Sequence, residues 1–301
     1  MRIVKSVASR VESNSNVLSV VAVPNMKNIV RLSDDNQVEV LAFLRQRPVH
    51  TVVMMSFIKD NGLDSELNRG KFFGYRNEEA VLEGVALIGH TTLIEARTDD
   101  ALHAFAIQAR TSETPIHVMM SEGKAIERFW SLYRQDATEP RLSFTEKLFE
   151  LNFPFPVQEC EWDITLADHS QIEQIAEAHA EVAFIESGVN PLEKDREGFL
   201  KRCARRIDME RTFVVFENGK LLFKADIAAE TEDVFYIEGV YVAPEARGRG
   251  IGPKCLSKLS AELLGRVENI CMLSNRKFEK VHASFEKAGY KSTDECTTIF
   301  V

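Results

Sequence analysis

Residues 233–252 constrain the fold of this chain more than any other stretch. Residues 233–242 are rich in β-branched and aromatic side chains, which favour an extended strand. Pro244 interrupts this run, and the basic, glycine-rich segment 247–252 (Arg-Gly-Arg-Gly-Ile-Gly) follows. A helix is predicted over about 253–264. This order of strand, glycine loop and helix N-terminus directs backbone N–H groups and the positive end of a helix dipole at one point, where they can hold a phosphate.

The composition of the loop agrees with phosphate binding. Gly250 and Gly252 are predicted to accept positive φ and to let the backbone approach a phosphate, while Arg247 and Arg249 add positive charge. Pro253 lacks an N–H group and removes one donor. The spacing G-x-G-x-G differs from the dinucleotide fingerprint G-x-G-x-x-G, and no Gly-Lys-Ser/Thr follows, so neither a Rossmann loop nor a P-loop is predicted. An ordinary strand–turn–helix connection is the alternative.

Two motifs carry a family resemblance. Arg247-x-x-Gly250-x-Gly252, after the strand, resembles the acyl-CoA signature of the GNAT superfamily of N-acetyltransferases. Residues 282–290 (His-Ala-Ser-Phe-Glu-Lys-Ala-Gly-Tyr) resemble the late helix and Gly-Tyr turn of that superfamily. The resemblance covers about 161–301, and the layout of the whole chain is similar to bacterial two-domain GNAT proteins whose N-terminal half is uncharacterised.

The resemblance implies that acetyl-CoA is the co-substrate, with its pyrophosphate on the N–H groups of residues 248–252. Its pantetheine would pair, like a strand, with Val240 and Val242. The N–H of Val242 would then stabilise the oxyanion formed from the thioester carbonyl, an effect worth about 3 kcal/mol in known oxyanion holes. The implied cofactor-binding residues are Val240, Tyr241, Val242, Arg247, Gly248, Arg249, Gly250, Ile251, Gly252, Asn275 and Phe285.

Acetylation of an amine requires a group that takes a proton from the ammonium form. Glu238 is the candidate general base, because strand alternation places it on the same face as Val240 and Val242. The alternative is a structural carboxylate that pairs with an arginine or binds the amine as a counter-ion. Both interpretations remain open at this point.

The acid that would protonate the leaving thiolate is missing. GNAT enzymes often place a tyrosine four residues before the late glycine, and this chain has Phe285 there. Water, Tyr241, Tyr290 or His282 could replace it. The departure also allows a second function class, a non-catalytic acyl-CoA-binding sensor or interaction protein.

The acceptor site is less defined by the sequence. Glu186 and Asn190 lie where the superfamily walls the acceptor site, so both are candidate substrate-binding residues. Helix capping and solvent exposure are the alternative roles for each. The acceptor would be a small-molecule amine, an amino acid or a protein amine.

The order of predicted elements divides the chain. The alternating prolines of 153–157 (Phe-Pro-Phe-Pro-Val) favour an extended linker, which places a boundary at about residue 156. Residues 157–301 would form the catalytic GNAT domain, and 31–156 show nearly the same element order. The predicted fold class is α+β (mixed α/β), with two tandem GNAT-like domains, each a mixed, mostly antiparallel twisted sheet flanked by helices. Residues 1–30 would be a leader or an extra strand.

The N-terminal half has a different loop at the equivalent position. Residues 94–100 read Ile-Glu-Ala-Arg-Thr-Asp-Asp, without glycine, and the two aspartates would repel a pyrophosphate. This domain is therefore predicted to lack CoA binding, and to cover the acceptor cleft or mediate homodimerisation.

The composition of the chain restricts the classes of partner that we predict. The net charge of −9 argues against nucleic acid as a partner, and no apolar stretch approaches the ~20 residues that span a bilayer. The apolar run 17–23 is too short for a typical signal peptide. Five scattered cysteines without C-x-x-C, and histidines without metal-ligand spacing, favour reduced thiols, no metal and a cytoplasmic location.

Overall fold

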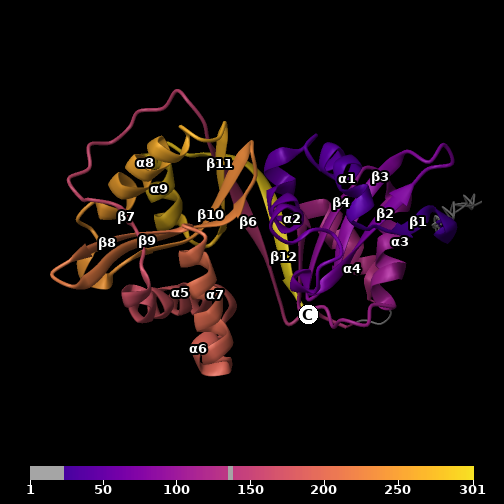
Figure 1. The fold of residues 1–301 in the computed structure, drawn as a ribbon, viewed down its shortest axis with the longest axis horizontal. Helices are drawn as coiled ribbons and strands as arrows, with labels where there is room; N and C mark the ends of the chain where they lie inside the picture. The colour runs from indigo at the N-terminus through magenta and orange to yellow at the C-terminus, as the bar shows by residue number, and fades with distance from the viewer. Residues whose placement is uncertain (1–23, 135–137) are drawn as a thin grey trace, which may run out of the picture.

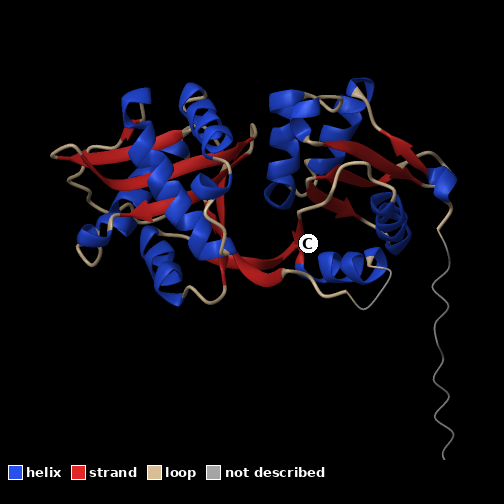
Figure 2. Cartoon of the chain, turned by 90° about the horizontal axis from the view of Figure 1, so that it is seen from below, coloured by secondary structure: helices blue, strands red, loops and turns tan. Residues whose placement is uncertain are grey.

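The computed structural model describes residues 24–134 and 138–301. These residues form a twelve-stranded sheet in the order β1-β2-β3-β4-β5-β12-β6-β11-β10-β9-β8-β7. Helices cover it in two lobes that lie side by side, joined by β6 and β12 (Figures 1 and 2). The predicted mixed, mostly antiparallel architecture is confirmed. The apolar run 17–23 lies outside the described residues.

The first lobe follows the predicted order. Only the strand expected over 115–119 lies about three residues later than predicted. Its elements are β1 (Ile29–Arg31), α1 (Gln37–Leu44), α2 (Pro48–Asn61), β2 (Gly70–Arg76), β3 (Leu82–Gly89), β4 (Thr91–Ala96), α3 (Asp99–Arg110), β5 (Val118–Glu122), α4 (Gly123–Tyr133) and β6 (Leu142–Leu151).

The second lobe contains the focal strand, loop and helix. Its elements are β7 (Thr165–Leu166), α5 (Ile172–Ser187), α6 (Pro191–Lys194), α7 (Arg196–Asp208), β8 (Thr212–Glu217), β9 (Lys220–Glu230), β10 (Val234–Val242), α8 (Ile251–Leu263), β11 (Asn269–Asn275), α9 (Glu279–Ala288) and β12 (Lys291–Phe300).

Local signals explain several of these boundaries. Asp168 and Gln171 form the predicted capping box before α5, and Gly188 ends that helix in the left-handed conformation at φ 72°. Asn218 and Gly219 turn the β8–β9 hairpin with φ of 52° and 77°. Helix ends and turns that are formed by residues close in the sequence are therefore predicted well.

Two element predictions were wrong, and one helix was not predicted. The strand expected over 161–166 is reduced to β7, because the preceding segment runs along α8 instead, where Ser257 Oγ accepts the N–H of Gln158 at 3.0 Å. The short helix α6 was not foreseen. The helix expected from residue 253 begins at Ile251, so the glycine loop is shorter than predicted.

The last strands of the two halves change places. β12 lies between β5 and β6, pairing antiparallel with both. β6 in turn pairs antiparallel with β11, from Ile270↔Leu151 to Asn275↔Glu146. The boundary proposed near residue 156 follows β6, so a cut there would separate two segments whose strands are interleaved. The division into domains stays a prediction.

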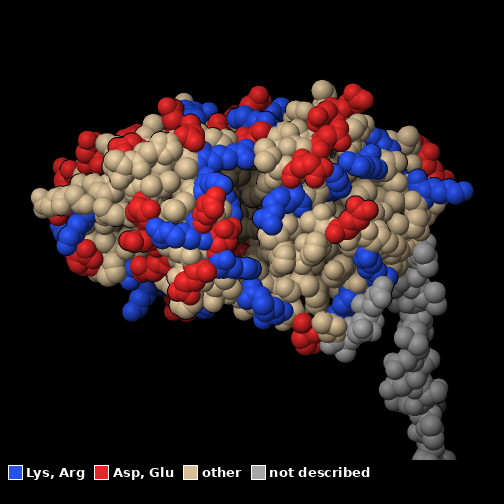
Figure 3. Space-filling model, turned by 60° about the horizontal axis from the view of Figure 1, so that its bottom comes forward, with Lys and Arg blue, Asp and Glu red and all other residues tan. Residues whose placement is uncertain are grey.

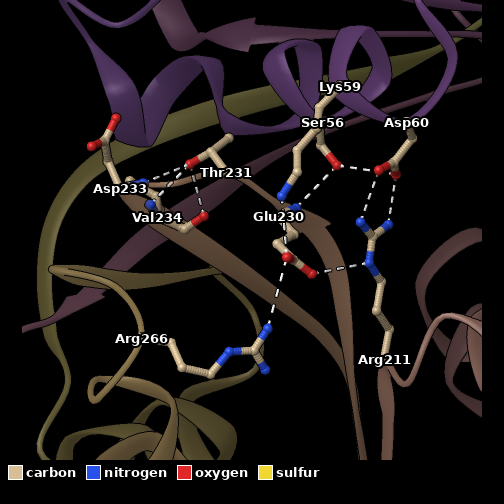
Figure 4. Close-up of polar contacts among 9 residues, drawn as sticks. All are labelled: Ser56, Lys59, Asp60, Arg211, Glu230, Thr231, Asp233, Val234 and Arg266. Carbon is tan, nitrogen blue, oxygen red and sulfur yellow. Dashed lines mark hydrogen bonds and ion pairs between the residues drawn. The ribbon is translucent and has the colours of Figure 1, made fainter.

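Helix α2 ties the first half to the sheet of the second. Val52 packs with Leu148, Ala229 and Val234 in one buried cluster. Beside this cluster lies a polar network that joins α2 to β8 and β9, drawn in Figure 4. It involves Ser56, Lys59, Asp60, Arg211, Glu230 and Arg266.

Charged side chains of both signs cover the face shown in Figure 3, and basic ones gather around the hollow between the lobes. No helix in the described residues has the length and apolar character needed to cross a bilayer.

Candidate active site

Strand β10 separates from its neighbour in the middle of the sheet. It pairs parallel with β11 only from Val234 to Tyr236. On its other side it stays paired with β9 as far as Val242↔Phe223. The second part of β10 therefore has one edge that is open for pairing with another extended group.

A β-bulge lies on this open part of the strand. Glu238 pairs with Asp226 and Tyr241 pairs with Lys224, so Gly239 and Val240 together oppose a single residue of β9. Gly239 adopts φ 60°, and a Cβ there would lie 2.9 Å from Lys224 Nζ. Only glycine fits this position without a rearrangement.

The bulge corrects the expected face of Glu238. Because paired residues share a face, Glu238 lies on the face of Asp226 and Lys224, together with Tyr241. Val242 pairs with Phe223 and lies on the opposite face. Simple alternation would have put Glu238 and Val242 on one face, and the extra residue in the bulge reverses that relation.

The backbone of Val242 points toward the open edge. The N–H of the next residue, Ala243, donates to Leu222 O in β9 at 2.9 Å, so the N–H and C=O of Val242 face away from β9. That carbonyl accepts a hydrogen bond from Arg247 Nε at 3.0 Å. Arg247 also contacts Glu181 of α5 at 3.0 Å. The N–H of Val242, the predicted oxyanion donor, therefore faces the open edge, and its role stays a prediction.

The glycine loop presents a cradle of free backbone N–H groups, and one of its expected conformations was wrong. Gly248 and Gly250 adopt φ of 79° and 82°. Gly252 does not, because it lies in the first turn of α8; its glycine is needed for space, since a Cβ would lie 3.2 Å from Val242 Cγ2. In the described part of the chain, the N–H groups of residues 248–252 donate to no other group. Free donors at a helix N-terminus fit a pyrophosphate.

A cavity of about 750 Å³ connects this cradle to the interior of the second lobe. The predicted residues that line it are Glu186, Glu238, Val240, Tyr241, Val242, Arg247, Gly248, Gly250, Ile251, Gly252 and Phe285. Arg249, Asn275 and Asn190 do not line it. Asn190 Oδ1 instead accepts the N–H of Leu192 at 3.0 Å as the cap of α6, and Asn275 Oδ1 accepts the N–H of Lys277 at 3.1 Å.

Glu238 belongs to a charged network under the bulge. Arg206 Nη2 of α7 contacts Glu238 Oε1 at 2.6 Å, and Arg206 Nη1 contacts Asp226 at 3.3 Å. Lys224 Nζ lies 2.5 Å from Asp226 and donates to Gly239 O at 3.1 Å. Burial opposes ionisation of Asp226, yet Lys224 and Arg206 together hold its pKa well below the usual range. The network matches the alternative in which Glu238 pairs with an arginine, and its role as base stays a prediction.

Besides Glu238 and the Glu181 already described, two carboxylates line the same cavity. Glu146 comes from β6 of the first half, and Glu186 from the last turn of α5. Burial raises the pKa of Glu146, and the charge of Glu238 adds to this effect. Partial desolvation, with the charges of Glu238 and Glu146, raises the pKa of Glu186 to about 7. Sequence reasoning missed Glu146, because only the strand exchange brings it here.

The replacements considered for the missing acid differ in position. Phe285 is buried with its ring centroid 5.5 Å from that of Phe149. The hydroxyl groups of Tyr290 and Ser260 share a buried hydrogen bond of 2.7 Å outside the cavity lining. His282 is also absent from the lining, whereas Tyr241 is part of it.

The equivalent loop of the first half is closed by its own side chains. β4 is antiparallel to β3 and parallel to β5, as β10 is to β9 and β11. At the start of α3, Thr98 Oγ1 accepts the N–H of Ala101 at 3.3 Å, and Asp99 pairs with Arg128 at 3.0 Å. The Thr98 side chain thus binds a backbone N–H group, that of Ala101, which a phosphate at this position would need.

The residues that form most of this site match a known protein family. A family model described as an acetyltransferase (GNAT) domain matches residues 208–292, which include β8 to α9. The second half of the chain therefore contains a GNAT acetyltransferase domain, and the resemblance seen in the sequence is confirmed. No curated protein matches the chain.

Solved structures share the fold over nearly the whole chain. A GNAT-family acetyltransferase from Colwellia psychrerythraea is 13% identical, with a TM-score of 0.56, over 90% of this chain and 98% of that one. A Drosophila protein is 14% identical, with a TM-score of 0.65, over 91% and 98%. A tandem GNAT protein from the clavulanic acid biosynthesis pathway is 10% identical, with a TM-score of 0.56, over 91% and 97%. At these identities the likeness concerns the fold.

Proposed function

We propose that the protein transfers the acetyl group of acetyl-CoA to a primary amine by direct attack in a ternary complex. The observation that carries this proposal is one continuous cavity, which is lined by the loop with its free N–H groups, by the open edge of β10 and by the carboxylates of Glu146, Glu186 and Glu238. The loop fits an anionic cofactor, and the carboxylates fit a cationic acceptor.

The residues of the cradle and of β10 have distinct roles in this proposal. The N–H groups of residues 248–252 would hold the pyrophosphate, and the open edge of β10 would pair with the pantetheine. The Val242 N–H would donate to the thioester carbonyl oxygen as negative charge develops there. Arg247 now occupies the Val242 carbonyl. Pairing at that carbonyl therefore requires Arg247 to release it, which would free its guanidinium for the phosphates.

The carboxylates would draw the ammonium group into the cavity and accept a proton from it. Phe285 has no hydroxyl, so the leaving thiolate would take its proton from the attacking amine or from water. A thiol is a good leaving group, and this step does not require a dedicated acid.

The proposal predicts release of the CoA thiol from acetyl-CoA in the presence of some members of a panel of small amines, amino acids and peptides. A thiol-reactive dye measures this release. CoA binding without turnover on any acceptor would favour the alternative, an acyl-CoA-binding sensor. No heat of binding with CoA or acetyl-CoA in calorimetry would contradict both functions.

The first half is proposed not to bind CoA, so one chain should bind one molecule. We expect a calorimetric stoichiometry near one CoA per chain. A second bound CoA in a crystal structure, beside Asp99 at the start of α3, would contradict this prediction. The self-capped turn at Thr98 is its physical reason.

A further inference from the structure

Four glutamates line the cavity, and they differ in what they contact. Glu181 pairs with Arg247 at 3.0 Å. Glu238 is held by Arg206 at 2.6 Å. Glu146 accepts a hydrogen bond from Thr298 Oγ1 at 2.5 Å. In the described residues, the Glu186 carboxylate has no hydrogen bond or ion pair, although it faces the same cavity. Its lone pairs are therefore available to a ligand.

We propose that Glu186, rather than Glu238, accepts the proton that the acceptor ammonium must lose. This inference rests on the proposed acetyl transfer. Glu238 then has the role that was left open from the sequence, as the partner of an arginine and a source of negative potential for the acceptor. A carboxylate that already accepts a charged hydrogen bond is a weaker base than a free one.

The backbone at Glu186 is held by its helix and by the first half of the chain. It lies in the last turn of α5, which Gly188 ends. Arg141, just before β6, donates to the carbonyl of Ser187 at 3.3 Å and so holds this turn against the exchanged strand. The negative end of the helix dipole also disfavours the charged form of Glu186.

The charged groups around Glu186 come from three other elements. Glu238 of β10 and Glu146 of β6 oppose its ionisation, and Lys277, between β11 and α9, favours it. Lys280 of α9 lines the cavity as well. Glu186 is an exposed residue by surface area, but the protein around its carboxylate partly desolvates it, and this effect together with the two other carboxylates raises the pKa of Glu186 to about 7. A base with a pKa near the working pH is the most effective one.

The proposed step balances as follows. The ammonium gives one proton to the Glu186 carboxylate, and the freed nitrogen lone pair forms the new C–N bond at the thioester carbonyl carbon. The C–S bond breaks, and its electron pair leaves on sulfur. The thiolate takes the second amine proton, and Glu186 returns its proton to solvent. Each acetyl transfer thus releases one proton.

The dependence of kcat on pH tests this role. In the wild type, kcat is expected to rise with pH through about 7, because Glu186 must be ionised to act as a base. Glu186→Gln should lower kcat at pH 7.5 by about 10²–10⁴-fold and abolish this rise of kcat with pH, the rising limb of the pH profile. Glu146→Gln should move the limb to lower pH, because a negative neighbour is lost. Glu238→Gln should keep the limb, also at lower pH, and raise KM for the amine.

Two variants control for folding and for general charge effects. Glu177→Gln changes an exposed glutamate on the same helix outside the cavity, and should leave kcat and the limb unchanged. Glu186→Gln should bind CoA as tightly as the wild type, since in the described residues no hydrogen bond or ion pair joins Glu186 to the loop 247–252. A pH limb that persists in Glu186→Gln and disappears in Glu238→Gln would overturn the assignment.

A second measurement needs no turnover. In protein labelled with carbon-13 at the glutamate carboxyl, one resonance should titrate near pH 7, be absent from Glu186→Gln, and titrate at lower pH in Glu146→Gln. Persistence of that resonance in Glu186→Gln would contradict the inference alone. Absence of turnover in the wild type, with normal CoA binding, would instead contradict the proposed acetyl transfer.

Discussion

Replacing Arg211 with alanine is expected to lower the free energy of unfolding by about 3–5 kcal/mol. The Arg211 side chain is only 8% exposed and donates to both carboxylate oxygens of Asp60, at 2.6 and 2.9 Å. It also contacts Glu230 at 3.3 Å (Figure 4). Without the guanidinium, Asp60 loses its charged partner at the contact between the two halves. Urea unfolding followed by circular dichroism measures the loss as a lower midpoint.

Lys59→Ala is the matched control for this prediction. Lys59 lies next to Asp60 on α2 and pairs with the same Glu230 at 3.2 Å, but its side chain is 47% exposed. A solvated pair of this kind contributes at most about 1 kcal/mol. Equal losses for Arg211→Ala and Lys59→Ala would show that burial of the guanidinium is not what makes the contact strong.

Replacing Gly252 with valine is expected to weaken CoA binding by at least about tenfold, equivalent to about 1.4 kcal/mol. A Cβ at this position would lie 3.2 Å from Val242 Cγ2 and 3.4 Å from Ser284 Oγ, and valine adds two methyl groups beyond it. These atoms would fill the space between the open edge of β10 and α9, where the cofactor is proposed to lie. Calorimetric titration with CoA measures the effect.

Gly219→Ala separates this effect from loss of stability. Gly219 has φ 77° in the β8–β9 turn, away from the cavity, and a Cβ there meets no atom within 4 Å. A left-handed residue with a side chain costs roughly 1–2 kcal/mol of stability. Gly219→Ala should therefore destabilise the fold and leave CoA affinity unchanged. A similar loss of affinity in both variants would contradict the placement of the cofactor at Gly252.

The cradle could be predicted because it is local. The donors of residues 248–252 and the open strand beside them follow one another along the chain, and backbone geometry brings them together without help from elsewhere. The bulge was not predicted, because it depends on the register of β10 against β9. In the sequence, Gly239 alone indicates the bulge, and a glycine within a strand has several explanations.

The remainder of the site depends on contacts between distant segments. Glu146 carries no motif, and residues 142–151 would make an equally good strand in either half. Its place beside Glu238 follows from pairing of β6 with β11, which no local pattern specifies. The same holds for Arg206, whose helix was predicted but whose partner on β10 was not.

The interleaving of β6 and β12 has a consequence for how this chain can change over evolutionary time. If the first half were lost, β11 would be left with a row of unsatisfied backbone groups along one side, which is a template for aggregation. If the last strand were lost, β5 would face the same problem. The first half, which is proposed not to bind CoA, can thus be retained because the sheet of the second half is not completed without it. Selection on the catalytic half alone would then preserve both.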